Sequence, residues 1–135
     1  MTKVLFLCNS NRGKSQMAAA LAKLHAPSWK VYSAGVQVTE PGQSGDVNLE
    51  ASHCLTEVGA DMSEGTPKPV DPELAANVDH VIIVGGAEYD GPAERWEIED
   101  PSQRGVEGKQ RMVELRDDID ARVKELIVRH NLVGH

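Results

Sequence analysis

A short apolar run that ends at a cysteine constrains the fold of this chain more than any other feature. The run from Val4 to Leu7 holds no polar residue and has the length of a strand that is covered on both faces. A polar, glycine-containing loop follows at once, from Cys8 to Ser15, and apolar side chains then recur at helical spacing from Gln16 to His25. The pattern predicts a strand, a tight loop and a helix in direct succession.

The same alternation continues along the chain. Further strands are predicted within Lys30 to Val36, at Val81 to Val84 and, briefly, at Arg95 to Ile98. Helical patterns follow a cap at Ser44 or Asp46, begin at Asp71-Pro72-Glu73, and run roughly from Gly108 to Arg129. We therefore expect an α/β fold, a single-domain three-layer sandwich over residues 1–135. Its four-stranded parallel sheet carries helices on both faces.

Charge and composition limit the classes of function. The 135 residues carry a formal net charge of −7, which disfavours binding to nucleic acid or to an anionic membrane surface. No segment has the ~20 consecutive apolar residues of a membrane span, and the apolar run near the start lacks the features of a signal peptide. We expect a cytoplasmic protein without nucleic-acid or membrane partners. Any anion site must be built locally, from backbone amides and a few cations.

The loop after the first strand has the components of such a site. In parallel sheets, ligands bind beyond the carboxyl ends of the strands, where Cys8 lies. Successive backbone N–H groups in a tight loop form an anion-binding concavity, and the helix behind it adds its partial positive charge. This field favours the thiolate of Cys8. The loop residues expected to hold an oxyanion are Asn9, Ser10, Asn11, Arg12, Gly13, Lys14 and Ser15.

Simpler readings of the same residues stay open at this point. Cys8 could be a small buried residue at a strand end, which composition alone makes about as probable as a catalytic role. A nucleotide-binding loop is disfavoured because Cys8 stands where its motif requires the first glycine. The five histidines are scattered, so we predict no metal site and no tightly bound cofactor.

Three motifs together resemble the low-molecular-weight protein tyrosine phosphatase family, and within it the arsenate reductases. They are C-x-x-N-x-x-[RK]-S after the first strand, Ser33-Ala34-Gly35 after the second, and Asp100-Pro101 late in the chain. The resemblance implies that Cys8 is the nucleophile, that Ser15 hydrogen-bonds its thiolate, and that Asn11 holds the shape of the loop. It also implies that Asp100 is the general acid. From the residues alone, Asp100 fits a turn or cap residue better.

Several departures from the family pattern narrow the function. Lys14 replaces the usual arginine, and Ser102-Gln103 replace the aromatic residues that follow Asp-Pro in the phosphatases. The region after the third strand lacks the two cysteines of thioredoxin-coupled reductases, and Cys54 lies on an apolar helix stripe. Ala19 replaces the glutamate of the potassium site that some reductases carry, so we expect no potassium.

These departures resemble the actinobacterial arsenate–mycothiol transferases, in which the second thiol comes from outside. The resemblance implies that Cys8, assisted by Lys14, Ser15 and Asp100, condenses arsenate with mycothiol as co-substrate. A separate mycoredoxin would reduce the product. Lys68 is a possible thiol-binding residue, with a solvated loop lysine as the simpler reading. Two alternatives stay open: a tyrosine or small phosphate-ester phosphatase, and a non-catalytic anion-binding domain.

Overall fold

Four parallel strands form the centre of the molecule. The computed structural model describes residues 2–133, and its strands are β1 (Lys3–Cys8), β2 (Lys30–Gly35), β3 (His80–Val84) and β4 (Glu94–Trp96). Their order across the sheet is β2-β1-β3-β4, and every pair is parallel. The strand that ends in Cys8 is therefore internal, with hydrogen-bonded neighbours on both sides.

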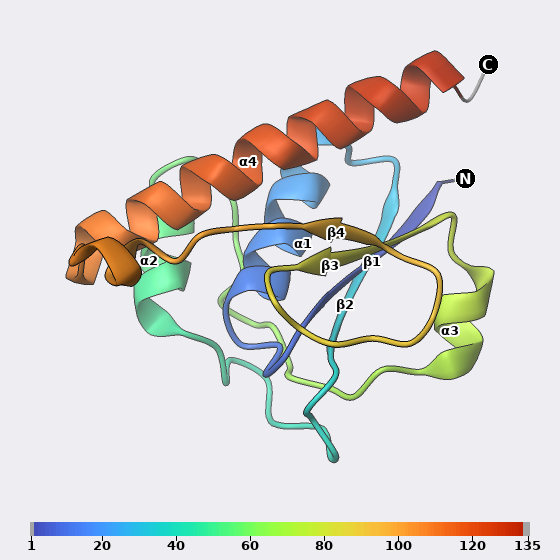
Figure 1. The fold of residues 1–135 in the computed structure, drawn as a ribbon, viewed down its shortest axis with the longest axis horizontal. Helices are drawn as coiled ribbons and strands as arrows, with labels where there is room; N and C mark the ends of the chain where they lie inside the picture. The colour runs from blue at the N-terminus through green and yellow to red at the C-terminus, as the bar shows by residue number, and fades with distance from the viewer. Residues whose placement is uncertain (1, 134–135) are drawn as a thin grey trace.

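Helices cover both faces of this sheet (Figure 1). One face packs against α1 (Lys14–His25), α2 (Leu49–Thr56) and the long α4 (Gly108–Val133). The other face packs against the short α3 (Pro72–Asn77) and the segment before it. The arrangement confirms the predicted α/β sandwich with a four-stranded parallel sheet.

Alternation along β1 divides the core into two layers. Val4 and Phe6 are fully buried with the side chains of α1, α2 and α4, whereas Leu5 and Leu7 are buried toward the α3 side. Because residues on a strand point alternately to opposite faces, a strand buried on both faces must be apolar at every position. This requirement explains the uninterrupted run that ends at Cys8.

The start of α2 differs from the sequence prediction. Neither Ser44 nor Asp46 caps this helix, which begins at Leu49; the Oδ1 atom of its N-cap, Asn48, accepts a hydrogen bond from the backbone N–H of Ala51 at 3.0 Å. Asp46 instead forms an ion pair with Arg12. Asp71 caps α3 as predicted, with its carboxylate accepting from the N–H of Glu73.

A short 3-10 helix, η1 (Pro101–Arg104), connects β4 to α4 and was not anticipated. Its N-cap is Asp100, and it ends at Gly105, which has a positive φ of 81°. The structure thereby places Asp100 at the N-terminal end of α4, to which η1 packs. Within residues 2–133, no helix is apolar enough over sufficient length to cross a membrane.

Candidate active site

Cys8 lies at the carboxyl end of β1, with its sulfur held by two hydrogen-bonding groups. The Ser15 Oγ atom is 2.9 Å from Cys8 Sγ, and the backbone N–H of Asn11 donates to the sulfur at 3.2 Å. Cys8, Asn11 and Ser15 are all buried. The structure thus brings together three residues that the sequence assigned to one loop.

Asn11 contacts the Ser15 hydroxyl that faces Cys8. Its side-chain Nδ2 donates to Ser15 Oγ at 2.7 Å, and Ser15 Oγ in turn forms a hydrogen bond with Cys8 Sγ in which either group can donate. When Ser15 donates, its O–H and the backbone N–H of Asn11 converge on the sulfur. Asn11 has a positive φ of 56°, a conformation that asparagine tolerates better than most residues.

A second layer of contacts fixes Asn11 itself. Gln16 Nε2 donates to the Asn11 carbonyl at 3.1 Å, and the backbone N–H of Lys68 donates to Asn11 Oδ1 at 3.1 Å. Gly35, from the Ser33-Ala34-Gly35 motif, packs against the loop so closely that a Cβ at this position would lie 2.6 Å from the Asn9 carbonyl oxygen. Glycine at position 35 is required by this contact.

Lys68 lies behind the loop rather than at the rim of the cavity that contains Cys8. Its Nζ donates to Asn11 Oδ1 at 3.3 Å and to the carbonyl of Thr66 at 2.7 Å. Burial, together with the nearby charge of Lys23, lowers the pKa of Lys68. At this position Lys68 does not face the Cys8 cavity, so the structure does not support the prediction that it binds an incoming thiol. Lys68 instead contacts Asn11.

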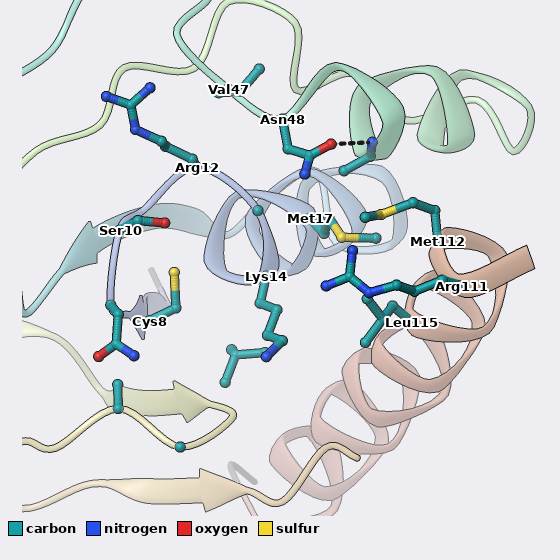
Figure 2. Close-up of a pocket in the computed structure, with 16 residues that line it drawn as sticks. Cys8, Ser10, Arg12, Lys14, Met17, Val47, Asn48, Arg111, Met112 and Leu115 are labelled. Atoms are coloured by element: carbon teal, nitrogen blue, oxygen red, sulfur yellow. Dashed lines mark hydrogen bonds between the residues drawn. The ribbon is translucent and has the colours of Figure 1, made fainter. Parts of the chain in front are cut away.

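The two cations within the loop point in different directions. Lys14 extends over the end of β3: a Cβ on Gly85 would lie 3.5 Å from its Nζ (Figure 2). Arg12 is exposed, and its guanidinium pairs with Asp46 on the outer side of the loop. Both residues line the cavity, but the Arg12 guanidinium is bound to Asp46 and ties the loop to the segment before α2, whereas Lys14 lies beside the end of β3.

The amides of the loop open onto the N-terminus of α1. Gly13 is the N-cap of this helix and provides no side-chain cap, so the first-turn N–H groups remain available to a ligand. Asn9, Ser10, Gly13 and Lys14 line the same cavity as Cys8. A tetrahedral oxyanion bound in front of the sulfur would meet these backbone donors and the charge of Lys14.

Asp100 does not line this cavity. Its carboxylate accepts two hydrogen bonds from Arg111, from Nε and from Nη2, both at 2.8 Å, and a third from the N–H of Ser102 at 3.0 Å. The Arg111 hydrogen bonds hold the pKa of Asp100 well below its usual range, with partial burial opposing them. In this arrangement Asp100 is an ionised helix cap, and its role as a general acid stays a prediction that requires the pair to open.

Sequence reasoning did not identify Arg111 or Asn48, which both line the cavity. Arg111 lies in the first turns of α4, and Asn48 is held near the loop because its backbone N–H donates to the Arg12 carbonyl at 2.8 Å. Only the Asn-Leu-Glu start of a helical pattern could have suggested Asn48 as a cap. No local signal places Arg111 beside a loop about 100 residues earlier.

Cys54 is buried in α2 and lines no part of the Cys8 cavity. Arg116 donates to its sulfur at 3.4 Å and to its carbonyl oxygen at 2.9 Å. Burial raises the pKa of the Cys54 thiol, with Arg116 opposing this effect. Across residues 2–133, no three His, Cys, Asp or Glu side chains gather as metal ligands would.

Comparison with known proteins identifies the family of this chain. The family model of the low-molecular-weight phosphotyrosine protein phosphatases matches residues 3–91, more than half of the chain. An arsenate reductase of Bacillus licheniformis is 33% identical over 133 residues, which cover 90% of this chain and 91% of the relative.

Two solved structures extend the comparison. An arsenate reductase in its phosphate-binding state superimposes with a TM-score of 0.77 at 30% identity, covering 96% of this chain and 98% of the other. A thioredoxin-dependent arsenate reductase of Corynebacterium glutamicum has a TM-score of 0.72 at 30% identity, with 98% of this chain and 63% of the other covered. The chain therefore belongs to the low-molecular-weight phosphotyrosine protein phosphatase family and is a homologue of its arsenate reductases.

Proposed function

We propose that this protein is an arsenate–mycothiol transferase that uses Cys8 as its nucleophile. The observation that carries the proposal is the pairing of one hydrogen-bonded thiol with the absence of a second thiol at the same cavity. Ser15 and Asn11 direct donors at Cys8 Sγ, while the one other cysteine, Cys54, lies elsewhere in the core. The cavity has no second cysteine that could form a disulfide with Cys8, so in this proposal the second thiol comes from another molecule.

The first step forms a bond between sulfur and arsenic. Arsenate occupies the loop amides in front of Cys8, the thiolate attacks arsenic, and one arsenate oxygen leaves as water after gaining protons. Arsenic stays pentavalent in this step. Asp100 is the proposed proton donor, and it can act only after Arg111 releases its carboxylate, because the present pair keeps Asp100 ionised.

The second step returns the enzyme to its starting state. The mycothiol thiolate attacks the arsenic atom, the bond between Cys8 and arsenic breaks, and the product is an arseno-mycothiol adduct. No electrons are transferred on this protein. A mycoredoxin thiolate then attacks the mycothiol sulfur of the adduct. The sulfur–arsenic bond breaks with its electron pair left on arsenic, which gives arsenite and a mixed disulfide between mycoredoxin and mycothiol.

Purified protein separates this function from its alternatives. We expect arsenate reduction with mycothiol and mycoredoxin, its loss in Cys8→Ser, and its retention in the matched variant Cys54→Ser. Rates with thioredoxin and its reductase alone that equal or exceed those with mycothiol would contradict the external-thiol mechanism. The alternative is a phosphatase, since the matching family is described as one of phosphotyrosine protein phosphatases. Arsenate turnover slower than the hydrolysis of an aryl phosphate would favour it.

A further inference from the structure

The cavity in front of Cys8 is larger than an oxyanion requires. Its volume of about 490 Å³ lies in the ~300–1,000 Å³ range typical of small-molecule pockets. Arsenate has five heavy atoms and would fill only the end formed by the Cys8 loop. The rest of the space extends away from the loop, between α2 and α4, toward Arg111, Met112 and Leu115 (Figure 2). We call this part the α2–α4 arm.

The walls of the α2–α4 arm combine apolar surface with hydrogen-bond donors. The apolar lining comes from Met17, Val47, Ala51, Met112 and Leu115. Asn48 uses its Oδ1 to cap α2, so its Nδ2 group is turned to the side of Arg111 and Met112 (Figure 2). Arg111 donates to Asp100 through Nε and Nη2, which leaves its Nη1 donors for a ligand.

Charge is distributed unevenly along the cavity. At the loop end, two cations line the cavity: Arg12 pairs with Asp46, whereas Lys14 has no carboxylate partner among the described residues. The N-terminus of α1 adds positive potential there. In the α2–α4 arm the one charged group is Arg111, which Asp100 neutralises through a bidentate pair. The cavity lining contains no aspartate or glutamate. The loop end thus suits an anion, whereas the arm suits an uncharged group that accepts hydrogen bonds.

We propose that the α2–α4 arm is the binding site for the body of the external thiol, and that it selects an uncharged, oxygen-rich thiol such as a glycosylated cysteine amide. The proposal rests on the transferase function above and adds the residues that recognise its second substrate. Asn48 and Arg111 donate to carbonyl or hydroxyl oxygens of this body. Met17 and Met112 contact its apolar edges, and its sulfur faces the arsenic bound at Cys8.

Asn48 permits a sharp test because its two roles can be separated. Asp and Ser are as good at an N-cap as Asn, so Asn48→Asp and Asn48→Ser keep α2 capped while they remove the amide donor from the arm. Loss of one hydrogen bond of ordinary strength predicts a roughly three- to tenfold higher KM for mycothiol, with kcat at saturating mycothiol retained. Asn77→Asp, on exposed α3, makes the same charge change away from the cavity and is the matched control.

A thiol series tests the charge argument. We expect kcat/KM for mycothiol to exceed the values for the anionic thiols glutathione and coenzyme A, and Asn48→Ser to reduce only the mycothiol value strongly. An unchanged mycothiol KM in both Asn48 variants, or a preference for glutathione, would overturn the assignment of the arm.

Failure of the wider proposal has a different signature. If the protein is not a transferase, the unaltered enzyme consumes no mycothiol in the presence of arsenate, whatever stands at position 48. Phosphate bound at the loop end should protect Cys8 from alkylation, and this protection depends on the loop end alone. We expect the degree of protection to be the same in the unaltered enzyme and in Asn48→Ser.

Discussion

Lys68 is joined to Asn11 twice, because its backbone N–H and its Nζ both donate to the Oδ1 atom of Asn11, at 3.1 and 3.3 Å. Asn11 in turn donates to Ser15, whose hydroxyl forms a hydrogen bond with Cys8 Sγ. A half-buried cation is thus connected to Cys8 through a chain of hydrogen bonds. Polarisation along such a chain strengthens each hydrogen bond and stabilises negative charge at its end.

The first prediction concerns this chain. We expect Lys68→Met to slow alkylation of Cys8 by iodoacetamide at pH 7, because a positive charge near the sulfur is lost. Lys68→Arg should recover part of the reactivity. Lys23 and Lys68 line a second pocket, separate from the Cys8 cavity, and Lys23→Met removes a charge from it without altering a contact of Asn11. An equal decrease in the alkylation rate in that variant would mean that the positive charge acts without the hydrogen bonds to Asn11.

The second prediction separates the backbone role of Asn11 from its side-chain role. Asn11→Gly keeps access to a positive φ, whereas Asn11→Ala adds strain of about 1–2 kcal/mol in this conformation. Both variants should lose Cys8 reactivity, because Ser15 loses its donor. Only Asn11→Ala should show the additional loss in the free energy of unfolding, measured by urea denaturation. Equal stability of the two variants would argue against a strained loop.

The third prediction addresses Asp100. Asn at position 100 still accepts the N–H of Ser102, so Asp100→Asn preserves the cap of η1 and removes only the acid and its pair with Arg111. If Asp100 donates a proton during turnover, the variant condenses arsenate with Cys8 about 10²-fold more slowly. Rapid-mixing measurements of arsenate-dependent loss of free thiol give this rate. An unaltered rate would assign Asp100 to capping alone.

The fourth prediction concerns stability against pH. His80 Nε2 lies 3.0 Å from His130 Nδ1, and His130 Nε2 lies 2.8 Å from Thr2 Oγ1, with Trp29 packed against both rings. Burial, followed by the charge of His130, lowers the pKa of His80 in the folded state. The unfolded chain therefore binds more protons once the pH falls below about 6.5. Stability is fully present above that pH and decreases as the pH falls toward the folded-state pKa.

Urea midpoints at pH 7.5 and 5.5 measure this effect. We expect the midpoint to fall between these two pH values in the unaltered protein and to fall less in His80→Gln. His53→Gln alters an exposed histidine of α2 and should leave the difference intact. A pH dependence that is identical in His80→Gln and in the unaltered protein would show that the His80–His130 pair contributes nothing to it.

Local patterns in the sequence were sufficient for the parts of the site that are contiguous in the chain. The strand, the loop and the helix around Cys8 follow from burial periodicity and from loop composition. Cys8, Asn11 and Ser15 meet because they lie within one stretch of eight residues. Asp71 was predictable as a cap because Pro72 follows it. These inferences need no knowledge of the tertiary fold.

The remainder depends on contacts between distant segments. Lys68 reaches Asn11 from behind the loop because the chain after α2 returns along β2, as the bridge between Gly35 and Pro69 shows. Arg111 reaches Asp100 because η1 folds back on α4. Neither contact produces a periodic pattern in the sequence. The sequence analysis therefore assigned Lys68 to thiol binding and did not identify Arg111. The cap at Asn48 was missed because Ser44 and Asp46, four and two residues earlier, carry the same signal.

The internal position of β1 has a consequence for how this enzyme can diverge. Cys8 sits on a strand that is paired on both sides, and its loop is fixed by Gly35 and Asn11, so the sulfur has little freedom to move. The opposite wall of the cavity comes from α2 and α4, which lie outside the sheet. In the proposed transferase, substitutions on these two helices would therefore change which thiol is accepted while the geometry at Cys8 is kept.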